Sequence, residues 1–170
     1  MNSKTKAVFL DRDGVINIDK SYVYKIEDFE FVDGVFEVLK EFLKRGYKLF
    51  IVTNQSGIGR GYYSEDDFFK LTSYMLDKLK EEGIEITKVY HCPHSPELNC
   101  ECRKPKPMML LRAKDEFDID MANSIMIGDK KSDMEAGKNA KVGKTIFIGE
   151  KKEIKADYSV GNILDILDII

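Results

Sequence analysis

The sequence predicts an α/β protein with a mostly parallel sheet between helical layers, because strand-like and helix-like segments alternate along the whole chain. Two observations carry this prediction. Several short runs are almost wholly apolar, as in strands buried on both faces, and the segments between them show the spacing of amphipathic helices. The 170 residues, 43% of them hydrophobic and 34% charged, suit one domain with a substantial core. We expect a single domain over residues 1–170.

The first half of the chain predicts two buried strands and two helices. AVFLD (7–11) is an apolar run that stops at acidic residues, and KLFIVTN (48–54) is a second run of the same kind. Between them, the alternation in 29–34 indicates an extended segment that ends on glycine. Apolar residues on one face then predict a helix over 34–46, with Gly46 as its stop. Ser64 followed by acids predicts the N-cap of a helix that continues to Gly83.

The second half repeats the alternation. Strand-like ITKVYHC (86–92) precedes a cysteine-rich loop, and Pro107 introduces a helix over 108–117. A third apolar strand, SIMIGD (124–129), ends in an acid and is followed by a helix over 131–140. The remaining expected elements are edge strands at 145–149 and 156–160 and a closing helix at 162–170.

Composition and charge exclude several classes of protein. The net charge of −3 and the absence of a basic stripe argue against nucleic acid or an anionic membrane surface as partner. The N-terminus turns charged after four apolar residues, too few for a signal peptide, and no apolar run approaches the ~20 residues that span a bilayer. Three cysteines within eleven residues make a poor disulfide framework. We expect a cytoplasmic monomer.

Polar residues follow three of the predicted strands at the point where each ends. Asp11 and Asp13 follow the first strand, Thr53 and Asn54 the second, and Asp129 comes after SIMIG. Any one of these residues could simply begin a turn or cap a helix. All of them together are expected at the same edge of a parallel sheet, where open α/β sheets bind their ligands.

Phosphoryl transfer is the chemistry that fits this set. A carboxylate such as Asp11 can attack phosphorus without a base, and a divalent cation must then lie between the two anions. Oxygen ligands from Asp11 and Asp129 suit Mg²⁺. Asp13 could protonate the departing alcohol and later activate water, while Thr53 and a lysine stabilise the transferring phosphoryl group.

Four motifs in order resemble those of haloacid-dehalogenase (HAD) superfamily phosphatases: VFLDRDGVIN, IVTNQSG, the lysine of CRKP and IGDKKSD. The resemblance implies a Rossmann-like fold, here without a large cap domain, and catalysis by Asp11 as nucleophile and Asp13 as acid and base. It implies Mg²⁺ bound by the Asp11 side chain, the Asp13 backbone carbonyl and the Asp129 side chain, with Asp133 just outside these ligands. Lys104 is the lysine of the third motif.

All three cysteines and one of the two histidines fall in the loop over about 92–102. Ligand type and clustering favour zinc over a chance cluster, although C-x-C is tighter than the usual zinc spacing. The loop resembles that of the subgroup of histidinol-phosphate and heptose-bisphosphate phosphatases. This resemblance implies a structural zinc bound by Cys92, His94, Cys100 and Cys102. His91 is expected to be an ordinary histidine at the core edge.

The same resemblance implies a set of substrate contacts around the strand ends. We expect contacts from the catalytic Thr53 and Lys104, from the cations Arg103 and Lys130, and from two loop stretches. These stretches comprise Asp19, Lys20, Ser21 and Tyr22 after the first motif, and Asn54, Gln55 and Ser56 after the second strand. Arg60 is a less certain further cation.

Within the subgroup, the first two motifs most resemble the heptose-bisphosphate phosphatases. These enzymes remove the 7-phosphate of D-glycero-D-manno-heptose 1,7-bisphosphate in the synthesis of ADP- or GDP-heptose, a precursor of lipopolysaccharide. Two features resemble instead the histidinol-phosphate phosphatases of histidine biosynthesis: the five-residue gap between His94 and Cys100, and the lysine at position 106. A zinc-stabilised binding module without turnover stays open as a third class, but it would have no need of both Asp11 and Asp13.

Overall fold

Six parallel strands in the order β3-β2-β1-β4-β5-β6 form the centre of the computed structural model, which describes residues 4–150 and 153–170. The strands are β1 (Ala7–Leu10), β2 (Lys48–Asn54), β3 (Ile86–Cys92), β4 (Ile125–Gly128), β5 (Lys144–Ile148) and β6 (Tyr158–Val160). The helices are α1 (Val35–Lys44), α2 (Ser56–Gly59), α3 (Glu65–Glu81), α4 (Met108–Phe117) and α5 (Lys131–Asn139). The alternation predicted this parallel sheet between helical layers, and the doubly wound, Rossmann-like arrangement is the one that the family resemblance implied.

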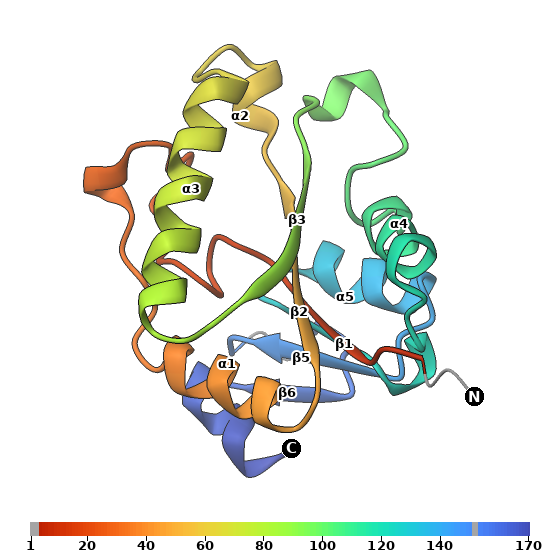
Figure 1. The fold of residues 1–170 in the computed structure, drawn as a ribbon. Helices are drawn as coiled ribbons and strands as arrows, with labels where there is room; N and C mark the ends of the chain where they lie inside the picture. The colour runs from red at the N-terminus through yellow and green to blue at the C-terminus, as the bar shows by residue number, and fades with distance from the viewer. Residues whose placement is uncertain (1–3, 151–152) are drawn as a thin grey trace.

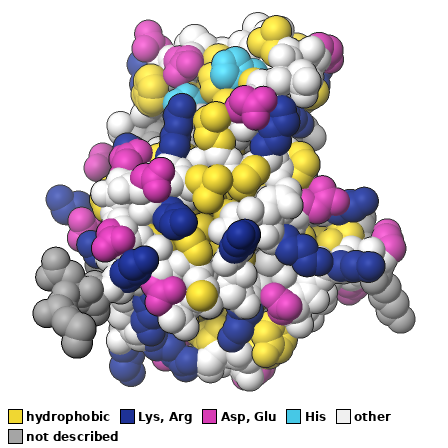
Figure 2. All heavy atoms as spheres, turned by 90° about the vertical axis from the view of Figure 1, so that its right-hand side faces the viewer, with side chains coloured by type: hydrophobic (Ala, Val, Ile, Leu, Met, Phe, Trp, Pro, Cys, Tyr) yellow, Lys and Arg dark blue, Asp and Glu magenta, His cyan; other side chains and the backbone are white. Residues whose placement is uncertain are grey.

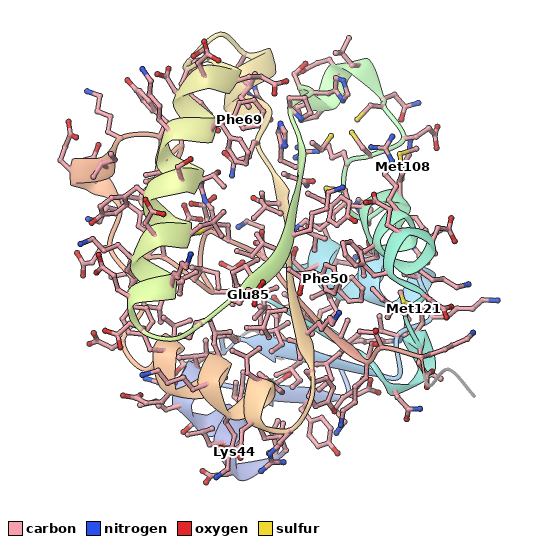
Figure 3. All side chains as sticks on the ribbon, viewed as in Figure 1. Lys44, Phe50, Phe69, Glu85, Met108 and Met121 are labelled. Atoms are coloured by element: carbon pink, nitrogen blue, oxygen red, sulfur yellow. The ribbon has the colours of Figure 1, made fainter. Side chains whose placement is uncertain are left out.

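Helices cover both faces of the sheet, and alternate residues of β1 show how the two cores are divided (Figure 1). Val8 and Leu10 belong to the core that includes α1 and α3, whereas Ala7 and Phe9 belong to the core that includes α4 and α5. Every residue of β1 is therefore fully buried. Phe50 of β2 lies near the middle of the sheet in Figure 3 and stacks obliquely on Phe9, with ring centroids 5.6 Å apart.

Most predicted elements are confirmed to within a few residues, but two expectations are wrong in part. Residues 29–34 are an extended segment that is not part of the sheet and makes an isolated bridge from Phe31 to Asn17. β5 is not an edge strand, because it pairs with β4 on one side and β6 on the other. The closing segment Ile163–Asp168 is a 3₁₀ helix, not an α-helix.

The N-cap prediction at Ser64 is confirmed. Its Oγ accepts a hydrogen bond from the Asp67 backbone N at 3.1 Å, and Asp67 Oδ2 accepts one from the Ser64 N at 3.0 Å. This reciprocal pair satisfies two amides that a helix start otherwise leaves free. Within the described ranges, no helix has the length and apolarity needed to cross a membrane. Figure 2 shows basic and acidic side chains interspersed over one face of the protein.

The strand order brings the ends of β1 and β4 together. The chain winds outward in one direction from β1 through β2 to β3, and in the other from β4 through β5 to β6. The boundary between β1 and β4 is the switch point at which such sheets bind their ligands. The loops after β2 and β3 extend past the sheet on one side, at the top of Figure 1.

Candidate active site

Asp11 and Asp129 meet at the switch point of the sheet. Asp11 directly follows β1, and its backbone N donates to the Ile127 carbonyl of β4 at 3.1 Å. Asp129 directly follows β4. The glycine of the first motif allows this approach, because a Cβ on Gly14 would lie 1.9 Å from Asp129 Oδ2 and its φ of +91° disfavours other residues.

Lys104 reaches this site from the loop after β3 and is almost completely buried. Its Nζ donates to Asp11 Oδ1 at 2.9 Å, to Asp133 Oδ1 at 2.6 Å and to the Val52 carbonyl at 2.8 Å. All three donor hydrogens of the ammonium group are therefore used. Asn54 holds the backbone of Lys104 by accepting from its N at 3.0 Å and donating to its carbonyl at 3.3 Å.

Asp133 is occupied on both sides of its carboxylate. Oδ1 accepts from Lys104, and Oδ2 accepts from the backbone N of Asp129 and of Lys130, each at 3.1 Å. It thus caps the start of α5 and orients the lysine at the same time. With both oxygens engaged, Asp133 suits a place next to a metal site better than a place among its ligands.

The two aspartates at the switch point are costly to ionise. Burial, and then the neighbouring charge of Asp133, raise the pKa of Asp11 to about 6, although Lys104 and Lys130 act in the opposite direction. Burial and the charge of Asp11 raise the pKa of Asp129 to about 6. A cation bound between these carboxylates would relieve the repulsion, and their oxygens are the donors that Mg²⁺ prefers. The donor set fits that ion.

Lys130 faces the same acids from the N-terminal end of α5. Its Nζ lies 3.5 Å from Asp129 Oδ1 and 3.6 Å from Asp19 Oδ2. Burial works against its charge, but the charges of Asp11 and the other aspartates outweigh burial and raise the pKa of Lys130. It remains a cation at the mouth of the site.

Asp13 is held by three donors, of which the sequence singled out Gln55 but not Arg12 or Asn17. Arg12 Nη2 donates to both of its carboxylate oxygens, at 3.0 and 3.2 Å, and Asn17 Nδ2 donates at 3.0 Å. Gln55 Nε2 lies 3.3 Å from Asp13 Oδ2 and 2.9 Å from Thr53 Oγ1. Tyr63 donates in turn to Gln55 Oε1. The only sequence signal for Arg12 is its place between two aspartates.

Two adjoining cavities open over these groups, and they share Asp13, Asn54, Ser56 and Lys130. The inner one has a volume of about 180 Å³, and the outer one about 270 Å³. The other residues of the inner cavity are Asp11, Arg103, Lys104, Ser132 and Asp133. The other residues of the outer cavity are Asp19, Ser21, Tyr22, Gln55 and Tyr63. Arg103 Nη1 is buried and has no hydrogen-bond partner among the described residues.

Three of the expected substrate contacts lie elsewhere. Lys20 forms an exposed pair with Glu30 at 3.4 Å and lines neither cavity. Thr53 is fully buried beneath Gln55 and also lines neither cavity. Arg60 contacts Ser56 Oγ at 3.4 Å but lines neither cavity. Ser132 and Tyr63 line the cavities without having been predicted.

Cys92, His94, Cys100 and Cys102 converge on one point after β3. The Sγ atom of Cys100 lies 3.4 Å from that of Cys92 and 3.7 Å from that of Cys102. His94 Nδ1 lies 3.6 Å from Cys92 Sγ and 3.2 Å from Cys102 Sγ. Tetrahedral zinc implies S···S separations of roughly 3.8 Å and N···S separations of roughly 3.5 Å. The cluster therefore has the size and donors of a zinc site.

His91 lies outside that cluster, as expected of a histidine at the core edge. Its ring stacks on Phe68 at 4.3 Å between centroids, and its Nε2 lies 3.1 Å from Glu65 Oε2. It therefore anchors the start of α3 to β3.

The fold and these side chains together define a phosphohydrolase of the HAD type. A buried aspartate held by a lysine, a second aspartate two residues on and an acid at the end of β4 occupy the switch point of a doubly wound sheet. Comparison with known proteins agrees with this class. A family model described as HAD-hydrolase-like matches residues 101–159.

Relatives of known name are similar over most of the chain. A D-glycero-alpha-D-manno-heptose-1,7-bisphosphate 7-phosphatase from Campylobacter jejuni is 66% identical over 88% of this chain and 86% of its own. The D-glycero-beta-D-manno-heptose-1,7-bisphosphate 7-phosphatase of Helicobacter pylori (strain 26695) is 56% identical over 84% of this chain and 83% of its own. The enzyme of the same name from Pasteurella multocida is 46% identical over 97% of this chain and 96% of its own. The chain therefore belongs to the HAD-type family of heptose-1,7-bisphosphate 7-phosphatases.

Solved structures show the same fold. A HAD-like phosphatase from Mesorhizobium loti superimposes with a TM-score of 0.89 at 28% identity, over 99% of this chain and 85% of its own. The D,D-heptose 1,7-bisphosphate phosphatase of B. bronchiseptica, solved with magnesium and phosphate, superimposes with a TM-score of 0.88 at 23% identity, over 97% of both chains.

Proposed function

We propose that this protein hydrolyses the 7-phosphate of D-glycero-D-manno-heptose 1,7-bisphosphate through an aspartyl-phosphate on Asp11. The observation that carries the proposal is the pairing of Asp11, fixed by Lys104, with Asp13 at the floor of a cavity whose rim holds further cations. Relatives at 46–66% identity that bear this activity in their names support the choice of substrate.

The first half of the reaction transfers the phosphoryl group to the enzyme. Asp11 Oδ1 is engaged by Lys104 and by the Arg12 backbone N, whereas Oδ2 accepts no hydrogen bond from the described residues. We assign the attack on phosphorus to Asp11 Oδ2. As the bond from phosphorus to the sugar oxygen breaks, the departing oxygen takes a proton from the Asp13 carboxyl.

The second half releases phosphate. Asp13, now a carboxylate, removes a proton from a water molecule whose oxygen attacks phosphorus, and the bond to Asp11 breaks. Mg²⁺ held by Asp11, Asp129 and the Asp13 backbone carbonyl would supply the positive charge that lets an anionic nucleophile approach a phosphate. Lys104 keeps Asp11 in place through both halves.

The cations around the inner cavity favour a bisphosphate over histidinol phosphate. A second phosphate needs cations besides those that serve the reacting group, and Arg103 and Lys130 are available at the rim. The unpartnered Nη1 of Arg103 suits the paired hydrogen bonds that a guanidinium makes to phosphate. Histidinol phosphate carries an amine instead, which these cations would repel.

A structural zinc in the cysteine loop completes the proposal. Three thiolates and one imidazole fill a tetrahedral site and leave no position for water, so the metal would hold the loop that carries Arg103 and Lys104. A phosphorylated sugar is the expected partner, and a cytoplasmic monomer remains our expectation.

Phosphate release from purified enzyme tests the substrate assignment. Both anomers of heptose 1,7-bisphosphate and histidinol phosphate are compared at equal concentration with Mg²⁺, and ³¹P NMR identifies the phosphate that remains. We expect the higher kcat/KM on a heptose bisphosphate, with the 1-phosphate retained. A higher kcat/KM on histidinol phosphate, or retention of the 7-phosphate, contradicts the assignment.

Arg103→Ala should reduce kcat/KM on the bisphosphate roughly ten- to a hundredfold, because one charge-assisted contact to phosphate is worth about 1.5–3 kcal/mol. Hydrolysis of p-nitrophenyl phosphate, which lacks a second phosphate, should fall much less. Arg112→Ala, on the exposed face of α4, is the matched control. Equal losses on both substrates would show that Arg103 serves the reacting group.

A further inference from the structure

A buried tyrosine outside all four motifs is connected to the acid/base aspartate. Tyr63 is 7% exposed, and its hydroxyl donates to Gln55 Oε1. Gln55 is 3% exposed, and its Nε2 contacts Asp13 Oδ2 at 3.3 Å and Thr53 Oγ1 at 2.9 Å. An uninterrupted path of hydrogen bonds therefore runs from Tyr63 to Asp13.

The direction of each hydrogen bond in this path is fixed by chemistry. An amide NH₂ only donates and an amide oxygen only accepts, and the NH₂ end of Gln55 faces Asp13 Oδ2 and Thr53 Oγ1. The carbonyl end then faces Tyr63, which must donate. The Tyr63 hydroxyl stabilises this orientation by donating to the amide oxygen, and the reverse orientation would point that oxygen at the Asp13 carboxyl.

Tyr63 is itself held firmly. Its ring stacks on Tyr24, with centroids 5.1 Å apart and an interplanar angle of 7°. The chain leaves room for it at Gly57 of α2, where a Cβ would lie 2.2 Å from Tyr63 Cε1. Burial raises the pKa of Tyr63 to about 12, so the hydroxyl keeps its proton at neutral pH.

We propose that Tyr63 is a positioning residue, which orients Gln55 so that its amide holds the Asp13 carboxyl in line with the departing oxygen. The proposal rests on the acid/base role of Asp13 given above, but not on the identity of the sugar. Protonation of the leaving group matters most when that group is a poor one, so the Tyr63 hydroxyl should matter most there.

The test is a series of substituted phenyl phosphates of increasing leaving-group basicity. The parameter is kcat/KM, which reports the steps up to phosphoryl transfer. In Tyr63→Phe, we expect kcat/KM to fall less than about threefold for p-nitrophenyl phosphate and roughly ten- to a hundredfold for the most basic leaving group. The larger loss is a part of the roughly 10²- to 10⁴-fold rate acceleration that a general acid contributes. A plot of log kcat/KM against the pKa of the leaving group should therefore be steeper for Tyr63→Phe than for wild type.

Tyr24→Phe is the matched control, because it removes a hydroxyl from the other ring of the stacked pair and should leave the slope unchanged. Gln55→Leu removes the amide itself and should steepen the plot as Tyr63→Phe does, which keeps the test available if Tyr63→Phe folds poorly. A parallel drop for all leaving groups, or an unchanged slope in both variants, overturns the proposal. Failure of the wild type on heptose bisphosphate would overturn only the substrate assignment, because the phenyl series does not use that sugar.

Discussion

At the scale of single residues, the balance of charge at the switch point explains why the site needs a metal. Four acids and three bases meet there, and they are Asp11, Asp13, Asp129, Asp133, Arg12, Lys104 and Lys130. Among these groups the excess is negative before any phosphate enters, and it adds to burial in raising the pKa values of Asp11 and Asp129. A divalent cation reverses the sign and lets a dianionic phosphate bind.

Asp11→Asn should abolish turnover and leave the fold intact. The amide is a poor nucleophile and a poor metal ligand, yet it keeps the shape and can still accept from Lys104. We expect kcat to fall by roughly 10⁴- to 10⁶-fold, the scale of losing a covalent nucleophile, with an unchanged circular dichroism spectrum. Asp115→Asn, in an exposed turn of α4, is the control and should be fully active. Near-normal phosphate release by purified Asp11→Asn would refute the covalent mechanism.

At the scale of elements, the cysteine loop supports α2 as well as Lys104. The Gln55 backbone N donates to the Cys92 carbonyl, and the Gly59 N donates to the Pro93 carbonyl, both at 2.8 Å. A Cβ on Gly59 would lie 2.7 Å from the Ser95 N, so α2 and the loop lie in direct contact. Figure 1 shows these two segments at the same end of the molecule. Ser56 of α2 and the preceding Gln55, which line the cavities, thus depend on the loop for their place.

Cys100→Ser should lower zinc content, stability and activity together. Wild-type protein should hold about one zinc per chain by elemental analysis. Loss of one ligand should lower the melting temperature by roughly 5–10 °C, because binding the metal orders the loop. The exposed Glu97→Gln in the same loop is the control. Wild-type protein prepared without chelators and free of zinc would contradict this interpretation.

The sequence predicts the parts of this site that follow strands and leaves out the parts that depend on distant contacts. Strand ends place Asp11 and Asp129 correctly at one edge, since a parallel sheet leaves little choice, whereas Lys104 was assigned to the site only by the family resemblance. Tyr63 has no such signal, because its contact with Gln55 depends on the turn between α2 and α3. Lys20 was expected near the substrate, but nothing local shows that its side chain turns toward Glu30.

The same distinction holds for the sheet. Apolar runs identify the strands, but they do not say which neighbour each strand takes. Residues 145–149 were expected at an edge, yet the short β6 covers that side of β5. Asp157 helps to fix this pairing, because its Oδ2 accepts from the Thr145 backbone N at 2.8 Å. A side-chain contact between residues twelve positions apart cannot be read from strand propensity.

At the scale of the whole molecule, the site lowers the stability of the metal-free protein. An aspartate in an unfolded chain titrates near pH 4, whereas the pKa values of Asp11 and Asp129 are raised to about 6 in the folded protein. Between these pH values the folded protein binds more protons than the unfolded chain, so its free energy of unfolding falls as pH rises through that window. Mg²⁺ binds the ionised carboxylates and should restore stability above it.

Asp129→Asn should therefore melt at a higher temperature than wild type at pH 7.5 without Mg²⁺, because it removes a buried charge that the wild type has to hold unneutralised. At pH 4.5 the two proteins should differ less, since Asp129 is then largely protonated. Added Mg²⁺ should raise the melting temperature of wild type by several degrees at pH 7.5 and should scarcely change that of Asp129→Asn.

Metal-free samples are prepared by exchange into magnesium-free buffer, since a strong chelator would also remove zinc from the cysteine loop. Asp120→Asn, far from the switch point, is the control and should follow wild type. If Asp129→Asn melts below wild type in metal-free buffer at pH 7.5, the carboxylate stabilises the fold by contacts of its own, and the conflict between stability and metal binding at this site does not exist.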